Sequence, residues 1–179
     1  MTQKINKVFQ QSGVIPYRII DGKVEILLIT TRNRQGWVIP KGGLCKGMSP
    51  HDSAAKEAWE EAGVIGRVTT ENLGNYKYCK RGNTYQVKLF LLPVETVLED
   101  WPEATSRERK WLEINQAAEL VKEISLKRII ESLEQLFKEL HKKIIQSCGM
   151  GILPVLVLCA GPDACTTREF GIFFYLEVS

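Results

Sequence analysis

Three glutamates, Glu57, Glu60 and Glu61, lie at positions i, i+3 and i+4 of one segment of the chain. If the segment is a helix, this spacing puts the carboxylates on one face, where each like-charged pair costs about 0.2–0.5 kcal/mol. Lys56 can compensate Glu60, but it is a single cation. Carboxylates gathered in this way are ligands that Mg²⁺ takes in proteins, together with water and substrate phosphates. The alternative is a solvated acidic face without a ligand.

The residues around the glutamates predict the helix that carries them. Ser49 is a favourable N-cap, Pro50 suits the first helical position, and Gly63 suits the left-handed position after the helix. Small residues and one tryptophan recur at helical spacing on another face, which predicts close packing: Ala54, Ala55, Ala58, Trp59 and Ala62. We therefore expect a helix of about three and a half turns directly after a glycine-rich loop.

This loop and helix together resemble the Nudix box, the sequence motif of the Nudix hydrolases. The box reads Gly, five residues, Glu, seven residues, and then Arg-Glu-hydrophobic-x-Glu-Glu-x-Gly-hydrophobic. The first glycine corresponds to Gly42, the glutamate run to residues 57–61, and the end of the motif to Gly63-Val64. On these residues the chain is identified as a member of the Nudix family.

Two positions depart from the motif. Met48 stands where the box has its first glutamate, and Lys56 replaces the arginine. The resemblance implies that these two side chains pair in the family and brace the loop against the helix. With both residues replaced, the family's pair between the loop and the helix is absent, but the three glutamates are kept.

The resemblance also implies a metal site. Mg²⁺, with Mn²⁺ as the alternative, is expected on the Gly42 carbonyl and on the carboxylates of Glu57, Glu60 and Glu61. In the family the three glutamates share the roles of metal ligand and general base. A bound metal ion polarises phosphoryl oxygens and lowers the pKa of its water, so that a carboxylate can complete the deprotonation. Which glutamate is the base stays open.

Basic residues before and after the glycine-rich loop are candidates for phosphate binding. Arg32 and Arg34 lie in a basic segment over residues 31–35, which we expect beside the loop. A guanidinium group matches the oxygens of a phosphate, although arginines in loops also serve solubility alone. A second basic patch, at the tip of the hairpin over residues 74–92, contains Lys77, Lys80 and Arg81.

A closer resemblance is to the diphosphoinositol polyphosphate phosphohydrolase branch of the family. It rests on Trp37–Gly43, Thr84-Tyr85, Leu98–Trp101 and Arg107–Trp111. The branch implies a densely anionic substrate, held by Arg32, Lys41 and Arg107 and by Gly43 of the loop. Where the branch has an arginine before Thr84, this chain has Asn83, and Arg81 is expected to substitute for it.

Composition limits the class of protein. The 179 residues, 44% hydrophobic and 25% charged, are typical of one soluble domain with its own core. A net charge of +3 suits a small anionic substrate and is too weak to indicate nucleic-acid binding, except at an RNA 5′ end. Five cysteines without C-x-x-C spacing and only two histidines argue against a zinc site.

No secretory signal pattern opens the chain, and it contains no run of about 18 apolar residues. From this and the reduced cysteines we expect a cytoplasmic location and no membrane partner. The chain is expected to be a monomer or a homodimer.

The remaining pattern predicts the elements that position these residues. Strands are expected over 13–20, 23–30, 36–40, 66–70, 74–79, 84–92 and 109–114, with a type I′ turn at Asp21-Gly22. Asn115 is expected to cap a short helix to 121, and Ser125 a longer one over 126–141. These elements predict an α/β fold, the α/β/α sandwich with a mixed central sheet that the resemblance also implies. The Nudix domain is expected over 1–142, and 143–179 as an extension of open role.

The sequence thus predicts a Mg²⁺-dependent Nudix pyrophosphohydrolase that cleaves a diphosphate linkage. Dinucleoside polyphosphates and diphosphoinositol polyphosphates are the favoured substrates. Nucleoside triphosphates and triphosphate-ended RNA are the alternatives within the same class. A non-catalytic Nudix module that senses a phosphorylated ligand is the alternative of a different class. Tyr76, Tyr78 and Tyr85, which alternate with other residues along the hairpin, either pack or stack on a nucleobase.

Overall fold

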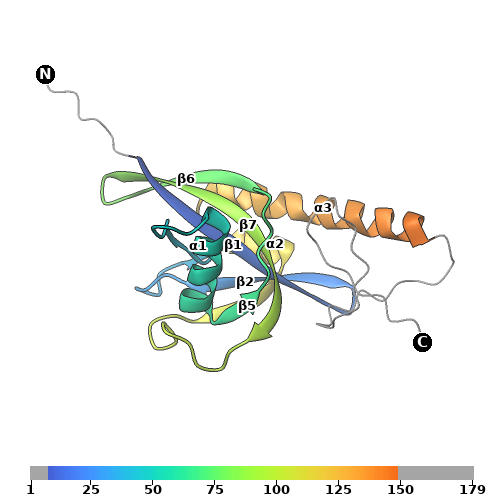
Figure 1. Cartoon of the computed structure of the whole chain (residues 1–179), viewed down its shortest axis with the longest axis horizontal. Helices are drawn as coiled ribbons and strands as arrows, with labels where there is room; N and C mark the ends of the chain where they lie inside the picture. Colours follow the sequence, from blue (N-terminus) through green and yellow to red (C-terminus); the bar gives the residue numbers. More distant parts are fainter. Residues whose placement is uncertain (1–7, 149–179) are drawn as a thin grey trace, which may run out of the picture.

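The structure, a computed structural model, describes residues 8–148. A mixed sheet lies between a helix on one side and two helices on the other (Figure 1). The strands are β1 (Val8–Ile20), β2 (Lys23–Thr30), β3 (Trp37–Val38), β4 (Lys41–Gly43), β5 (Val64–Gly66), β6 (Gly74–Lys80), β7 (Asn83–Val97) and β8 (Arg109–Glu113). The helical segments are α1 (Pro50–Glu57), the π-helical turn η1 (Ala58–Ala62), α2 (Ile114–Leu120) and α3 (Ile124–Cys148).

Strand β1 organises the sheet because it contacts three other strands. It runs antiparallel to β2 and β4 and parallel to β7. The order is β3-β2-β1-β7-β5, with β8 paired to β2 and β6 paired to β7. The predicted α/β class with a mixed sheet is confirmed. The pairing of Gly42 with Ser12 brings the glycine-rich loop onto β1.

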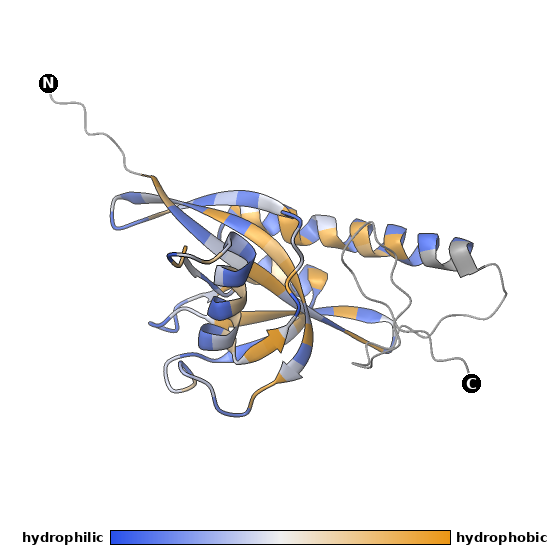
Figure 2. Ribbon diagram, viewed as in Figure 1, coloured by the Kyte–Doolittle hydropathy of each residue, from blue (hydrophilic) through white to orange (hydrophobic). Residues whose placement is uncertain are grey.

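The sheet separates two hydrophobic cores, which makes the molecule a three-layer sandwich. Leu27 and Leu28 are adjacent and fully buried, but Leu27 packs with Ala54 and Ala58 of the α1 layer. Leu28 packs instead into the core beneath α2 and α3, with Leu126 among its members. This opposition follows from the alternation of side chains along a strand. Figure 2 shows the hydrophobic colour concentrated in the strands and alternating with hydrophilic colour along α3.

The turn and the long helix predicted from sequence form as expected. Asp21 and Gly22 both have positive φ, 50° and 75°, as the type I′ turn between β1 and β2 requires. In α3 the predicted apolar stripe faces the core, and its members Ile130 and Leu133 are completely buried. The helix starts earlier than predicted, because α3 begins at Ile124, and Ser125, the predicted cap, lies inside it.

Three other predicted boundaries were wrong. The strand expected over 66–70 is β5 at Val64–Gly66, and its register against β7 shifts between Ile65 and Gly66. The acidic segment after residue 95, expected as a loop, continues β7 to Val97 because β5 pairs with it. Asn115 is no cap, since α2 begins at Ile114 without a side-chain cap.

Helix α3 continues past residue 142, the predicted end of the Nudix domain, to Cys148. Residues 143–148 of the predicted extension therefore belong to α3, and residues 149–179 lie outside the described residues. Within residues 8–148 no helix has the length and apolar character needed to cross a membrane.

Candidate active site

The helix that carries the glutamates starts as predicted. The Ser49 hydroxyl accepts a hydrogen bond of 3.1 Å from the Asp52 amide, and Pro50 is the first helical residue. The buried Ser12 hydroxyl of β1 donates to the Pro50 carbonyl, which fixes the helix start to the sheet. Gly63 ends the helix in the left-handed conformation, with φ 63°. Ser49 and Gly63 thus mark the two ends of the helix, and β1 holds its start.

Between these ends the helix is not uniform, which the sequence did not predict. It is α-helical to Glu57 and then widens into the π-helical turn η1, which carries Glu60 and Glu61. Single π-helical turns are often found at functional sites. The three carboxylates have different surroundings.

The carboxylate of Glu57 lies against the backbone of the glycine-rich loop. A Cβ at Gly42 would overlap this carboxylate as it lies, so a side chain there would have to displace the end of Glu57. Burial, together with the charges of Glu61 and Glu60, raises the pKa of Glu57 to about 7. A carboxyl group in this state favours a bound cation, because a cation would offset the crowded negative charge.

Glu61 is buried and links the helix to two other elements. It accepts a hydrogen bond of 3.0 Å from the Lys41 amide of β4 and forms an ion pair with Arg107. Burial raises its pKa, while the Lys41 amide and the Arg107 guanidinium act in the opposite direction. Glu60 is more exposed and forms an ion pair with Lys56. The lysine that replaces the family arginine therefore holds one of the three glutamates.

As they lie, the glutamates are on one helical segment but are not gathered around one point. Among residues 8–148, no three side chains of His, Cys, Asp or Glu converge closely enough to hold a metal ion together. The oxygen donors are nevertheless the type that a hard divalent cation takes. Glu57 and Glu60 are not bonded to a buried cation, and Glu61 keeps further lone pairs on both oxygens. The residues therefore fit a divalent metal ion, without a preformed cage.

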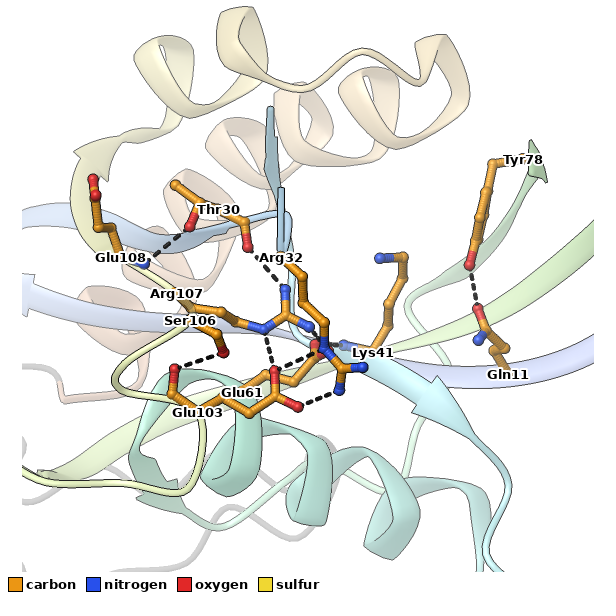
Figure 3. A network of polar contacts seen from close by, with 10 residues as sticks. All are labelled: Gln11, Thr30, Arg32, Lys41, Glu61, Tyr78, Glu103, Ser106, Arg107 and Glu108. Carbon is orange, nitrogen blue, oxygen red and sulfur yellow. Dashed lines mark hydrogen bonds and ion pairs between the residues drawn. The ribbon is translucent and has the colours of Figure 1, made fainter. Parts of the chain in front are cut away.

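Arg107, predicted as a phosphate contact, is turned into the protein. Its Nε donates to Glu103 at 2.5 Å, its Nη1 to the Thr30 carbonyl at 2.8 Å, and its Nη2 to Glu61 (Figure 3). The side chain is 7% exposed. Its donors are therefore occupied by protein oxygens, and its role in this arrangement is to hold the helix carboxylate.

The other predicted arginines differ in position. Arg32 is 72% exposed and pairs with Glu103, which it shares with Arg107. Burial by itself would raise the pKa of Glu103, but the hydrogen bonds from the two arginines lower it. Arg34 reaches the neighbouring loop, where it pairs with Glu108 at 3.2 Å. Arg32 is thus an exposed guanidinium beside the glutamate helix, and Arg34 is farther along the same loop.

The side chain of Lys41 extends toward the α2 and α3 side of the sheet, away from the glutamate helix (Figure 3). Its ammonium nitrogen is 5.4 Å from the centre of the Tyr78 ring, and the Tyr78 hydroxyl donates to Gln11 at 2.7 Å. Burial lowers the pKa of Lys41, and the charges of Glu61 and Glu123 oppose this. The backbone of Lys41 therefore contacts the glutamate helix, while its side chain lies on the α2 and α3 side of the sheet.

The last two predicted site residues, Gly43 and Arg81, do not belong to this network of polar contacts. Gly43 pairs with Gln11 and has open space where a side chain would be. Arg81 has φ 51° in the turn between β6 and β7, and within residues 8–148 it has no hydrogen bond or ion pair to the other predicted site residues. The expected substitution of Arg81 for the branch arginine stays a prediction.

Sequence reasoning missed the segment that clamps the C-terminal end of the glutamate helix. Arg109 donates to the carbonyls of Ala62 at 3.0 Å, Gly63 at 3.4 Å and Leu98 at 2.6 Å. Its guanidinium lies 4.1 Å from the centre of the Trp101 ring. The clamp lies within the two segments that supported the branch resemblance, but their spacing alone does not indicate which arginine takes which role.

Comparisons with known proteins agree with this arrangement. The family model described as NUDIX domain matches residues 10–133. Nudix hydrolase 12, mitochondrial, of Arabidopsis thaliana is 32% identical over 149 residues, covering 72% of this chain and 73% of the relative. Diphosphoinositol polyphosphate phosphohydrolase 3-beta of Bos taurus is 28% identical over 133 residues, covering 73% and 72%. An Ap4A hydrolase complex from C. elegans has a TM-score of 0.62 at 22% identity, covering 73% of this chain and 98% of that chain.

The chain therefore belongs to the Nudix family, as the box residues indicated. It is a hydrolase of the pyrophosphohydrolase class, which confirms the prediction of an enzyme. The structural likeness, at 22% identity, shows the shared fold.

The predicted cytoplasmic location was wrong. Several relatives from Arabidopsis thaliana carry mitochondrial in their names, and another carries chloroplastic. The prediction rested on reduced cysteines and on missing secretory and membrane-spanning patterns. Cys45 and Cys79 are indeed free thiols, but free thiols do not distinguish one reducing compartment from another.

Proposed function

We propose that the protein is a Mg²⁺-dependent pyrophosphohydrolase that cleaves a diphosphate linkage in a nucleoside diphosphate derivative or a polyphosphate. The observation that carries the proposal is the Glu57 carboxylate pressed against the backbone at Gly42, beside two further glutamates. Crowded carboxylates that lie against a loop backbone and its carbonyl oxygens are the kind of donor set that a hard cation takes. Mn²⁺ is the alternative metal.

We assign the metal to Glu57, Glu60, Glu61 and the Gly42 carbonyl. A divalent cation bound there supplies Lewis acidity toward phosphoryl oxygens and a more acidic water. By the resemblance, the three glutamates share the roles of metal ligand and general base, and which of them is the base stays open. The exposed Arg32 beside the glutamate helix is proposed to stabilise the charge of the substrate phosphates, whereas Lys41 contacts this helix through its backbone amide.

Dinucleoside polyphosphates and diphosphoinositol polyphosphates are the substrates to test first. The names of two similar proteins, an Ap4A hydrolase and a diphosphoinositol polyphosphate phosphohydrolase, support this choice. Nucleoside triphosphates and triphosphate-ended RNA remain alternatives. Compounds of all these classes contain at least two linked phosphates.

The test is the release of phosphate or mononucleotide from a panel of these compounds and ADP-ribose, with Mg²⁺ and with EDTA. We expect turnover of at least one class with Mg²⁺ and none with EDTA. Glu60→Gln is expected to abolish turnover while the melting temperature and substrate binding stay near those of the wild type. Glu119→Gln, at an exposed position of α2, is the matched control and should keep full activity. Wild-type activity in Glu60→Gln would contradict the metal assignment.

A further inference from the structure

Glu103 contacts two arginines of different exposure, and the proposed reaction gives its carboxylate no role. The carboxylate accepts hydrogen bonds from the exposed Arg32 and from the Nε of the buried Arg107, the latter at 2.5 Å (Figure 3). It is 18% exposed and lies between a guanidinium in solvent and one inside the protein. One carboxylate thus joins a surface arginine to the network around Glu61.

The backbone of Glu103 is fixed independently of its side chain. Its amide donates to the Glu60 carbonyl in η1 at 3.1 Å, and its carbonyl accepts from the amides of Ser106 and Arg107, each at 3.0 Å. None of these three bonds involves the carboxylate. The side chain can therefore change partners without moving the segment that holds the glutamate helix.

The two ion pairs of Glu103 differ in how easily they break. Arg107 is buried, and its other donors bond the Thr30 carbonyl at 2.8 Å and Glu61. Removing one partner of a buried ion pair is strongly destabilising. Arg32 is exposed, so water and salt weaken its pair with Glu103. Of the two arginines, Arg32 is therefore the one that a ligand can take from Glu103.

A substrate phosphate competes with Glu103 for Arg32. A terminal phosphate carries more negative charge than a carboxylate, and its oxygens match the guanidinium fork. Glu103 occupies this fork with both oxygens, because the Arg32 Nη2 donates to Oε1 and the Nε donates to Oε2 at 3.4 Å. A phosphate on the same fork must break this pair, which leaves the carboxylate to Arg107.

We propose that Glu103 is a positioning residue that exchanges partners when substrate binds. It occupies Arg32 until a substrate phosphate displaces it, and it holds Arg107, and through Arg107 the proposed metal ligand Glu61, throughout the reaction. The inference rests on the proposed function for the phosphate at Arg32 and for the role of Glu61. It predicts that the charge of Glu103 opposes substrate binding but supports turnover.

Glu103→Gln tests both effects, because the amide keeps the size of the side chain and removes its charge. Calorimetry with Mg²⁺ measures the Kd of uncleavable methylene-bridged analogues of diadenosine tetraphosphate and of a diphosphoinositol polyphosphate. We expect the Kd of the tighter-binding analogue to fall about threefold. The kcat on the matching substrate should fall about tenfold, because Glu61 is held less firmly. Hydrogen exchange at residues 58–64 should stay as in the wild type, since the Glu103 amide keeps its bond to Glu60.

Two further variants assign the binding effect to Arg32. In an Arg32→Met background, Glu103→Gln should leave the Kd unchanged, because the arginine that it releases is gone. Arg32→Met alone should raise KM about tenfold and keep kcat near that of the wild type, because Glu103 still holds Arg107. This result can be read whether or not Glu103→Gln folds. Glu99→Gln, at an exposed position of the same segment, removes an equal charge and should match the wild type.

A Glu103→Gln variant that binds the analogue more weakly than the wild type would overturn the proposal, because a purely structural role raises Kd and lowers kcat together. So would an Arg32→Met variant whose kcat falls as far as that of Glu103→Gln. The outcome is separable from that of the proposed function. A protein that binds the analogue more tightly after Glu103→Gln but cleaves nothing would refute the enzymatic assignment alone. An active enzyme in which Glu103→Gln changes neither Kd nor kcat would refute the partner exchange alone.

Discussion

At the scale of single residues, the three glutamates of the box have become chemically different. Glu57 is half-buried with a raised pKa, Glu60 is paired with an exposed lysine, and Glu61 is buried against an arginine. Identical side chains acquire different proton affinities when burial and charged neighbours differ. The differences suggest a division of labour, with Glu57 the one whose protonation changes near neutral pH.

The titration of Glu57 predicts how stability depends on pH without metal. Its folded pKa of about 7 lies above the ordinary value of 4.5, so the folded state holds the proton more tightly. The resulting stabilisation is complete below 4.5 and is lost as the pH rises through about 7. Urea unfolding in EDTA between pH 5 and 8 should show this decrease, and Glu57→Gln should lack it. Equal pH slopes in the two proteins would contradict the raised pKa.

Arg107 shows a second effect at the residue scale, because it neutralises two buried or half-buried carboxylates. Arg107→Leu leaves Glu61 and Glu103 without this partner and is expected to cost about 3–5 kcal/mol in the free energy of unfolding. Arg128→Leu, at an exposed position of α3, is the control and should change little. Urea unfolding measures both variants. If Arg107→Leu cost no more than the control, Arg107 would not be needed to neutralise Glu61 and Glu103.

At the scale of elements, the segment from Leu98 to Arg109 holds the C-terminal end of the glutamate helix. The Leu98 amide donates to the Gly63 carbonyl at 2.8 Å, and the Glu103 amide to the Glu60 carbonyl at 3.1 Å. These donors satisfy carbonyls that a helix end or a widened turn leaves free. The orientation of Glu60 and Glu61 therefore depends on a segment about 40 residues later in the chain.

Removing the Arg109 side chain tests this clamp. Arg109→Met loses the bonds to the carbonyls of Ala62, Gly63 and Leu98 and is expected to cost about 2 kcal/mol. Hydrogen exchange should become faster in residues 58–64, and kcat should fall because the glutamates are held less firmly. Lys110→Met, an exposed neighbour, is the control. Unchanged exchange at 58–64 in Arg109→Met would argue against the clamp.

At the scale of the whole molecule, the sheet separates two cores, and the glutamate helix packs on only one of them. Leu27→Ala and Leu28→Ala remove equally buried side chains and should each cost about 2–5 kcal/mol. Leu27→Ala should in addition lower kcat at temperatures well below unfolding, because Leu27 packs on Ala54 and Ala58. Thermal unfolding and steady-state kinetics separate the two effects. Equal losses of kcat would mean that the layers are not independent.

The sequence predicted the features of this molecule that depend on nearby residues. Ser49 and Gly63 mark the helix ends, and Asp21-Gly22 fixes a turn, because each acts through its own backbone geometry. The π-helical turn was missed because one of its carbonyls is bonded by Glu103, far along the chain. The direction of Arg107 was missed for a related reason, since only the fold brings Glu61 and Thr30 to it.

The widened turn at Ala58–Ala62 also limits how this segment can change by descent. A π-helical turn holds about one residue more than the α-helical turn in its place, so a deletion of one residue there would close the helix into a regular α-helix and leave the segments on both sides in place. An insertion or deletion elsewhere in the regular part of the helix would instead rotate everything after it by about 100°. Lineages in which this turn is α-helical are therefore expected to have one residue fewer between Glu57 and Gly63.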